Sequence, residues 1–309
     1  MVETMPQAGS SATDGLFADT FAEAFPMTAA RVVVTADSAN WAQIAATTMT
    51  GYATSVIACD AEAGVERHLG AEETPDGRPG VSILVFAFSR DALEKAVANR
   101  VGQCVMTCPT TACYNGLPLG EKAIRVGGML RYFGDGWQIS KRLGGRRYWR
   151  IPVMDGEFVC EATTAVTKTA VGGGNLIIIG RTSETTRLAA EAAAAAIARV
   201  PDVIAPFPGG IVRSGSKVGS KYKGMSASTN DAYCPTLRGT AKTSLDADAG
   251  AVLEIVVDGL TSQAVASAMR AGIAAIVKLG PKRGATRISA GNYGGKLGPH
   301  HYHLRDLLP

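Results

Sequence analysis

Short apolar runs alternate along the chain with stretches of helical periodicity, and the same alternation occurs twice. The first copy predicts strands and helices, in order, at 31–35, 38–50, 53–58, 81–88, 89–100 and 104–107. The second predicts them at 175–180, 183–199, 203–205, 251–258, 261–279 and 286–290. Helix-capping residues fit the starts of these helices, namely Ser38, Ser89, Ser183 and Thr261. Each β-α-β-β-α-β copy is therefore expected to form an α+β, ferredoxin-like lobe with helices on one face of an antiparallel sheet.

The second copy places about 45 residues between its second and third strands, where such units usually have a short connection. This polar stretch, from Phe207 to the strand that carries Glu254, is rich in glycine, serine and lysine. Such residues supply backbone N–H donors and positive charge but have no apolar face to bury. The first copy has a shorter counterpart at 59–80. We expect the long loop to be a binding element.

Glu254 is the one polar residue in the apolar run Ala251–Val257. A carboxyl inside a buried strand has to be paired with a cation, remain protonated, or face a cleft. One interpretation is a buried salt bridge to a loop lysine or an arginine. The other is a carboxyl whose pKa is raised by desolvation, able to exchange a proton near neutrality. Glu254 is accordingly the leading catalytic candidate.

Residues 124–166, between the copies, alternate apolar and polar positions with turns, which predicts a β-meander or arm that contacts another subunit. The domain organisation expected is a flexible leader at 1–18, an N-terminal lobe with the arm at 19–150, and a C-terminal lobe with the long loop and Glu254 at 151–309. A chain of 309 residues with 46% hydrophobic content suffices for two cores.

Charge and hydropathy argue against a membrane protein and against a nucleic-acid-binding protein. No apolar run approaches bilayer length and the first residues do not resemble a signal peptide, so we expect a soluble cytoplasmic protein without a membrane partner. The net charge of +4 is mild and is concentrated in the lysines of the loop. It favours a small anionic ligand over nucleic acid.

Six cysteines and a histidine cluster are weak metal candidates. Cys104, Cys108 and Cys113 are close in sequence but lack the C-x-x-C spacing of zinc sites, so inert reduced thiols are expected, with redox or metal roles as the alternative. The H-H-x-H run at 300–303 has no carboxylate or cysteine at ligand spacing, which favours a surface or interface role over a metal. We expect no metal site.

Four glycine- or asparagine-containing motifs have alternative interpretations. Residues 210–217 resemble a phosphate loop but lead into no helix, and the glycines at 172–174 precede a strand, unlike a dinucleotide fingerprint. Thr229 and Asn230 fit a simple Asx turn as well as a site. The run GNYGGKLG at 291–298 is either a tight turn or a ligand-lining loop that presents Asn292 and Lys296.

Seven segments of the chain resemble formylmethanofuran–tetrahydromethanopterin formyltransferases. They are DTFAEAFPMTAARVVVTA (19–36), EETPDGRPGV (72–81), RVGQCVMTCPT (100–110), FGDG (133–136), PFPGGIVRSGSKVGSK (206–221), ASTNDAYCPT (227–236) and ISAGNYGGKLG (288–298). The mildly basic composition and the leader make the chain similar to bacterial, methylotroph-type members.

The resemblance implies two ferredoxin-like lobes, oligomers such as a dimer of dimers, and active sites in clefts near subunit interfaces. It implies formyl transfer between N5 of tetrahydromethanopterin and the amine of methanofuran or a bacterial analogue, as cosubstrates, with no tightly bound cofactor. In a bacterial member the formyl group would move toward the furan analogue, and a partner formylmethanofuran hydrolase would release formate, on the route from formaldehyde to formate. The family's catalytic glutamate falls on Glu254.

Formyl transfer passes through a tetrahedral carbon, so the site needs a proton shuttle and donors for an oxyanion. We expect Glu254 to be the shuttle. The candidate oxyanion donors are the N–H groups of Gly209 and Gly210 and the side chains of Ser216, Thr229 and Asn230. Candidate contacts to the cosubstrates, including carboxylates or phosphate, come from Lys217, Lys221, Lys223, Asn292 and Lys296.

Two rival functions remain open from sequence. One is a non-catalytic scaffold subunit of a formyltransferase/hydrolase complex that has kept the fold and lost the activity. The other is a nucleic-acid-binding ferredoxin-like module, for which the chain lacks stacking aromatic residues in an RNA-reading pattern.

Overall fold

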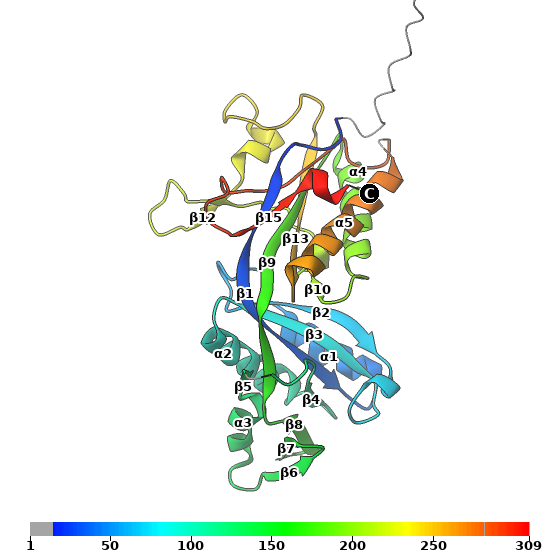
Figure 1. The fold of residues 1–309 in the computed structure, drawn as a ribbon, viewed down its shortest axis with the longest axis vertical. Helices are drawn as coiled ribbons and strands as arrows, with labels where there is room; N and C mark the ends of the chain where they lie inside the picture. The colour runs from blue at the N-terminus through cyan, green and yellow to red at the C-terminus, as the bar shows by residue number, and fades with distance from the viewer. Residues whose placement is uncertain (1–14, 121, 281, 309) are drawn as a thin grey trace, which may run out of the picture.

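The computed structural model describes residues 15–120, 122–280 and 282–308, and it is built around two long strands (Figure 1). Strands β1 (Phe21–Thr35) and β9 (Thr164–Gly180) lie antiparallel and side by side, and together they link the two ends of the molecule. The sequence predicted only 31–35 and 175–180. The missed parts are rich in alanine, glycine and threonine, which give little apolar signal.

The first unit combines part of β1 with two helices and three further strands. These elements are α1 (Ala39–Thr50), β2 (Glu62–Leu69), β3 (Gly80–Ala87), α2 (Arg90–Arg100) and β4 (Ala112–Asn115). Its strand order is β2-β3-β1-β4, and all three pairings are antiparallel. The predicted caps Ser38 and Ser89 are confirmed, because each side chain accepts a backbone N–H of the first helical turn.

The strand predicted at 53–58 is wrong. These residues form turns in which the amides of Ala58 and Cys59 donate to the Ser55 carbonyl. The partner of β3 is instead β2, which is more polar and pairs with no strand but β3 among the described residues. The polar residues of β2 are tolerated because Arg67 and His68 are exposed and the buried side chain of Glu66 is paired with Arg31 at 2.6 Å. The shorter connection therefore spans 70–79, not 59–80.

The strand predicted at 104–107 is also wrong. Residues Val101–Val105 continue α2 as a wider helical turn, and the fourth strand of the unit comes later, at β4. Val101 and Val105 are both fully buried in the core of the first unit. Their spacing of four residues places them on one helical face, so core packing favours the helix.

The second unit repeats the order with β9 as its first strand. Its other elements are α4 (Ser183–Ile197), β10 (Val203–Ile204), β13 (Ala251–Gly259), α5 (Ser262–Leu279) and β14 (Arg287–Ser289). The strand order β10-β13-β9-β14 matches that of the first unit. Thr261 caps α5 as predicted, whereas α4 is capped by Thr182, one residue before the predicted Ser183.

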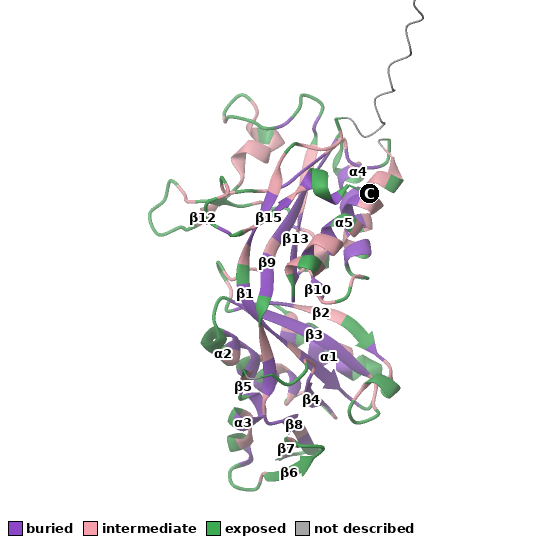
Figure 2. Ribbon diagram, viewed as in Figure 1, coloured by how far each residue is buried: buried purple, intermediate pink, exposed green. Residues whose placement is uncertain are grey.

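An antiparallel meander extends the sheet at the end of the molecule away from the second unit (Figure 1). It consists of β6 (Ile139–Leu143), β7 (Arg146–Val153) and β8 (Gly156–Glu161), and it follows β5 (Ala123–Ile124) and the short helix α3 (Val126–Leu130). The predicted meander is confirmed, although α3 was not foreseen. Strand β6 is exposed along its whole length (Figure 2).

The long polar loop is confirmed between β10 and β13. It contains only the two-residue strands β11 (Lys217–Val218) and β12 (Ala227–Ser228), with short 3-10 turns, and most of it is exposed or half-buried (Figure 2). Near the C-terminus, β15 (His300–His303) pairs with the start of β1. Of the leader expected at 1–18, residues 1–14 lie outside the described part, while Phe17 forms a bridge with Ile288 of β14.

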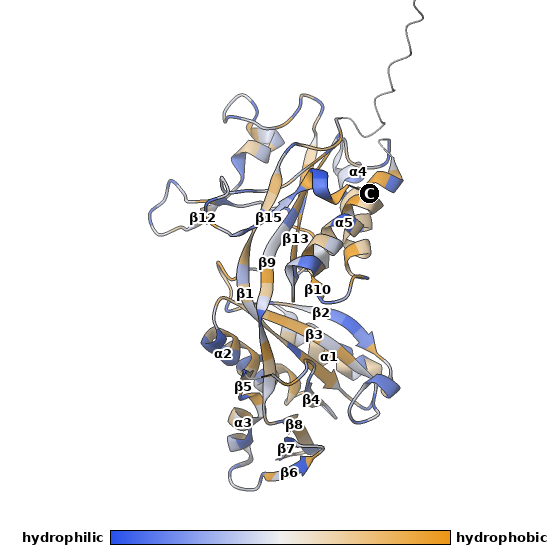
Figure 3. Ribbon diagram, in the orientation of Figure 1, coloured by the Kyte–Doolittle hydropathy of each residue, from blue (hydrophilic) through white to orange (hydrophobic). Residues whose placement is uncertain are grey.

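Each unit has its own apolar core. The first lies between its sheet and α1 and α2, and the second lies between its sheet and α4 and α5; orange apolar residues gather in the strands that form them (Figure 3). The units meet at a smaller cluster that includes Phe86 and Leu260, and at an ion pair of Arg31 of β1 with Asp202, which precedes β10 (2.5 Å). In the described ranges, no helix is long and apolar enough to cross a bilayer.

Candidate active site

Glu254 lies on β13, between β9 and the long loop. Its backbone pairs with Ile177 of β9 on one side and with Val212 of the loop on the other. The side chain is partly buried. Because strand pairing fixes the backbone on both sides, the direction of this carboxyl is set by the sheet, and the loop is fastened to the sheet at the same residue.

The Glu254 carboxyl has no ionic partner within the described ranges: no lysine, arginine or histidine nitrogen there lies within 4.0 Å of it. Burial raises its pKa from 4.5 to about 7. The buried salt bridge considered from the sequence is therefore absent from this part of the chain. A carboxyl with a pKa near neutrality is suited to both donating and accepting a proton.

The carboxyl faces a cavity of about 240 Å³ between the sheet and two loops. Its walls come from β9, the long loop and the segment after β14. They are formed by Thr20, Ile177, Ser216, Lys217, Asn230, Tyr233, Glu254, Ala290, Gly291, Asn292 and Tyr293. A smaller cavity of about 40 Å³ adjoins it, shares Glu254 and Asn230, and adds Arg213 and Cys234. The site is thus a polar pocket with one apolar wall from β9.

The structure brings together only part of the predicted site. Ser216, Lys217, Asn230 and Asn292 line the cavity with Glu254. The remaining predicted residues do not line it; they are Gly209, Gly210, Lys221, Thr229 and Lys296. Sequence proximity within a loop does not ensure a shared pocket, because the loop folds back on itself through 3-10 turns and the β11–β12 pair.

The excluded residues have other environments. Gly209 and Gly210 line a separate cavity of about 350 Å³ at the junction of the two units. The Thr229 hydroxyl contacts the Cys234 sulfur at 3.5 Å. Lys221 and Lys296 are exposed, Lys221 in the outer part of the long loop and Lys296 in the loop after β14, which leaves their ammonium groups available to ligands that extend out of the pocket.

Lys217 forms an ion pair within the long loop. Its Nζ lies 2.7 Å from Asp231 Oδ2, and both side chains are more than a third exposed. The hydrogen bond from Lys217 lowers the pKa of Asp231. An exposed pair of this kind contributes little to stability, so a carboxylate ligand can replace Asp231 as the partner of Lys217.

Two tyrosines in the cavity wall were missed by the sequence argument. The Tyr233 hydroxyl lies 3.1 Å from Ser289 Oγ at the end of β14. Burial raises the pKa of the Tyr293 phenol, and the neighbouring Glu254 charge raises it further, while Ser216 lowers it. Both tyrosines are aromatic residues with a polar end inside the segments 227–236 and 288–298, and that combination was the available signal.

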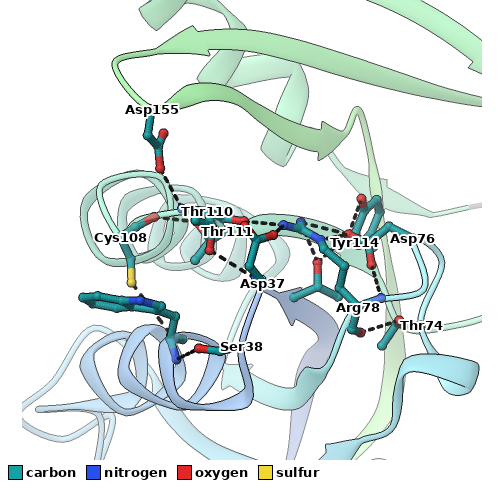
Figure 4. Close-up of polar contacts among 12 residues, drawn as sticks. Asp37, Ser38, Thr74, Asp76, Arg78, Cys108, Thr110, Thr111, Tyr114 and Asp155 are labelled. Atoms are coloured by element: carbon teal, nitrogen blue, oxygen red, sulfur yellow. Dashed lines mark hydrogen bonds and ion pairs between the residues drawn. The ribbon is translucent and has the colours of Figure 1, made fainter.

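A second dense group of charges lies in the first unit (Figure 4). Arg78 contacts Asp37 and Asp76, each at 2.9 Å, and Asp76 also accepts hydrogen bonds from Thr35 (2.7 Å) and Tyr114 (3.0 Å). Burial alone would raise the pKa of Asp76, but these donors hold it below its usual value. The cluster fastens the 70–79 connection to β1 and β4 and leaves no free acid or base, unlike Glu254.

No arrangement suited to a metal ion occurs in the described ranges, where no three His, Cys, Asp or Glu side chains gather at ligand distance. His301 packs against the Phe21 ring at 4.8 Å between centroids, and its Nε2 lies 3.0 Å from the Gly298 carbonyl. His300, His301 and His303 all lie on β15, which pairs with the start of β1. All six cysteines are free.

Comparison with known proteins identifies the family. The model for formylmethanofuran–tetrahydromethanopterin formyltransferase matches residues 13–153, and the model for the proximal lobe of the same enzyme matches residues 156–307. A formyltransferase of that name from Methylococcus capsulatus is 60% identical and covers 94% of this chain and 97% of its own length. A subunit of the formyltransferase/hydrolase complex of Methylorubrum extorquens is 57% identical, with 94% of each chain covered.

Two solved structures agree with the fold. The formyltransferase/hydrolase complex from Methylorubrum extorquens, determined with methylofuran, contains a chain that superposes with a TM-score of 0.92 at 56% identity, covering 95% of this chain and 96% of its own. The formyltransferase from Methanosarcina barkeri gives a TM-score of 0.88 at 47% identity, covering 94% and 97%. The higher identity to the two bacterial proteins confirms the predicted methylotroph-type relationship. The chain therefore belongs to the formylmethanofuran–tetrahydromethanopterin formyltransferase family and is a transferase of one-carbon metabolism.

Proposed function

We propose that this chain moves a formyl group between N5 of tetrahydromethanopterin and the primary amine of methanofuran or a bacterial analogue, with Glu254 as the acid/base. The observation that carries the proposal is the carboxyl of Glu254, which faces a polar cavity without a cation beside it in the described ranges and has a pKa of about 7. Both coenzymes act as cosubstrates, and no tightly bound cofactor takes part.

The chemistry needs one proton relay. The attacking amine adds to the formamide carbon and forms a tetrahedral intermediate, and the C–N bond to the donor nitrogen then breaks. Ionised Glu254 takes the proton released by the attacking nitrogen, and the same carboxyl, now protonated, returns it to the leaving nitrogen. One group serves both steps, so no net proton is gained or lost within the site.

The oxyanion of the intermediate needs donors that converge on the same carbon. Ser216 and Asn230 support this role because both line the cavity with Glu254. We assign the role to these side chains and not to the N–H groups of Gly209 and Gly210, which line the other cavity. The Tyr293 phenol, in the same wall, is a further donor.

Three lysines and an amide are proposed to hold the coenzymes. Lys217 and Asn292 line the cavity, and Lys221 and Lys296 are exposed on nearby loops. Carboxylates of a polyglutamyl furan coenzyme, or the phosphate of the pterin coenzyme, would be their partners. Transfer is proposed to run from formyl-tetrahydromethanopterin to the furan analogue, followed by hydrolysis to formate.

The architecture supports a division of the chain into two lobes. We propose two ferredoxin-like lobes, at 19–150 and 151–309, since both units share one element order and one strand order. The end of β7 and all of β8, at 151–161, extend the sheet of the first unit across this boundary. Exposed large apolar side chains gather on the meander and the segment before it, where they support an interface in a homo-oligomer such as a dimer of dimers. They are Met129, Tyr132, Phe133, Trp137, Ile139, Leu143 and Met154.

Association with a formylmethanofuran hydrolase is proposed by analogy with the complex of Methylorubrum extorquens. A cytoplasmic location is proposed because all six cysteines are free thiols, which persist in a reducing compartment. Neither proposal affects the chemistry assigned to Glu254.

The deciding experiment is a formyl-transfer assay of the isolated chain with both coenzymes. Glu254→Gln keeps the side-chain shape but cannot carry the proton, so kcat should fall by roughly 10²–10⁴-fold. Glu184→Gln, an exposed glutamate on α4, is the matched control and should leave kcat unchanged. Near-normal turnover of Glu254→Gln would remove this residue from the chemistry, and absence of transfer by the wild-type chain would favour the scaffold alternative.

A further inference from the structure

Glu23 is a fully buried carboxylate that holds the loop after β14 from within the protein. Its Oε2 accepts the backbone N–H groups of Tyr293 (2.7 Å) and Gly295 (2.8 Å). Its Oε1 accepts those of Leu297 (2.5 Å) and Gly298 (2.6 Å). Burial raises the pKa of Glu23, but the four N–H donors outweigh it and hold the pKa below its usual value, so the carboxyl is ionised inside the protein.

The loop is shaped to converge on this one side chain. Gly294 and Gly295 both adopt positive φ, which turns successive N–H groups toward the same side of the backbone. At its start, the loop is also held by Asn175 of β9, whose side-chain oxygen accepts the Gly291 N–H at 2.6 Å. Five backbone N–H groups of the segment 291–298 are therefore held by two side chains, and four of the five are held by Glu23.

The residue placed by this anchor is Tyr293. Its N–H is bound by Glu23, its ring lies 6.0 Å from that of Phe25, and its side chain lines the Glu254 cavity. The charge of Glu254 raises the pKa of the Tyr293 phenol, which indicates that the two groups are close. Glu23 itself lines neither cavity that contains Glu254.

We infer that Glu23 is a positioning residue for formyl transfer: its charge fixes the 291–298 loop so that the Tyr293 phenol is held in the wall of the pocket opposite Glu254. The inference rests on the proposed function and adds to it a residue that acts through another. A full negative charge suits this task because charge-assisted hydrogen bonds to four N–H groups are stronger and more directional than neutral ones. A displacement of about 1 Å in a positioned group can lower a rate by about 10²-fold.

The test is a double-mutant cycle of Glu23→Gln and Tyr293→Phe, assayed as kcat and KM for both coenzymes. Each single variant should lower kcat by about 10- to 100-fold with KM nearly unchanged, because the donor contributes mainly in the transition state. The double variant should be no slower than the slower single variant. Losses that multiply, or a Glu23→Gln enzyme with wild-type kcat, would overturn the inference.

Glu161→Gln is the matched control for a purely structural effect. Glu161 is also buried and accepts a backbone N–H, from Asn115 at 3.1 Å, but it lies in the first unit. Its variant should lower the melting temperature and leave kcat per folded molecule unchanged. Glu23→Asp, which keeps the charge, should recover part of the activity lost in Glu23→Gln.

Amide hydrogen exchange separates failure of this inference from failure of the proposed function. In Glu23→Asp, or in Glu23→Gln if it folds, the amides of residues 293–298 should exchange faster than in the wild type, whichever reaction the enzyme catalyses. Unchanged exchange would refute the anchor even if Glu254→Gln is inactive. Faster exchange with an inactive wild type would refute the formyl-transfer assignment and keep the anchor.

Discussion

The backbones of Val212 and Glu254 exchange two hydrogen bonds, with Val212 N donating at 2.7 Å and Glu254 N donating at 2.9 Å. The pair joins the start of the long polar loop to the strand that carries the catalytic candidate. Ser216 and Lys217 follow Val212 within a few residues and line the same cavity. Movement of the loop base is therefore coupled to the position of Glu254, and the sheet keeps both in register.

The raised pKa of Glu254 predicts an ionisation near neutrality in the rate profile. Because burial holds this pKa at about 7, kcat/KM measured between about pH 5 and 9 should show a transition near pH 7. The transition should be missing from the residual activity of Glu254→Gln. If that variant retains the same transition, another group controls the profile.

Asp258, on β13, predicts a pH dependence of stability. It is fully buried beside Glu62 of the first unit, and desolvation, together with the Glu62 charge, raises its pKa well above 3.8. Because the pKa of Asp258 is higher in the folded than in the unfolded state, protonated Asp258 contributes to stability at low pH, and this contribution is lost as pH rises through the folded-state pKa. Asp258→Asn mimics the protonated form, so it should remove this loss.

The expected result is a pH-dependent difference in the free energy of unfolding between Asp258→Asn and the parent protein. Denaturant unfolding at about pH 5 and pH 9 measures it, with Asp258→Asn favoured at the higher pH and nearly neutral at the lower. The pKa of Glu254 is also raised, so this residue would add its own pH dependence of stability. Both proteins in the comparison should therefore carry Glu254→Gln. A variant that is less stable at both pH values would contradict a protonated Asp258 in the folded protein.

The loop lysines predict a selective effect on coenzyme binding. Lys217→Gln with Lys221→Gln should raise KM for a polyglutamylated furan coenzyme by more than for a truncated one, because only the long tail carries the carboxylates that the lysines meet. Lys242→Gln, an exposed lysine of the same loop that lines no described cavity, is the control. Equal increases for both coenzymes would contradict tail binding.

The variant Gly298→Ala tests how tightly the loop after β14 packs against β1. A Cβ at this position would lie 2.3 Å from the Ala24 carbonyl oxygen, a backbone atom that cannot move without displacing β1. The variant should be less stable by about 1–3 kcal/mol and should lose activity as the 291–298 loop shifts. Gly120→Ala, where a Cβ meets nothing within 4 Å, should change the free energy of unfolding by less than about 0.5 kcal/mol.

Much of the fold could be predicted from local signals. The caps Ser38, Ser89 and Thr261 and the strand at 251–258 were found because capping and apolar runs depend on neighbouring residues alone. The errors at 53–58 and 104–107 arose where tertiary contacts outweighed local preference. At 53–58 an apolar run forms turns, and near 104 the buried face of α2 extends the helix.

For the candidate site, the sequence by itself determined that Glu254 is an isolated carboxyl in an apolar strand and that a long polar loop precedes it. Only the tertiary structure decided which loop residues share its cavity, that Tyr233 and Tyr293 join them, and that Gly209 and Gly210 do not. The physical reason is that a pocket is defined by distances between segments far apart in the chain. Those distances depend on strand pairing and on buried anchors such as Glu23, neither of which leaves a periodic pattern in the sequence.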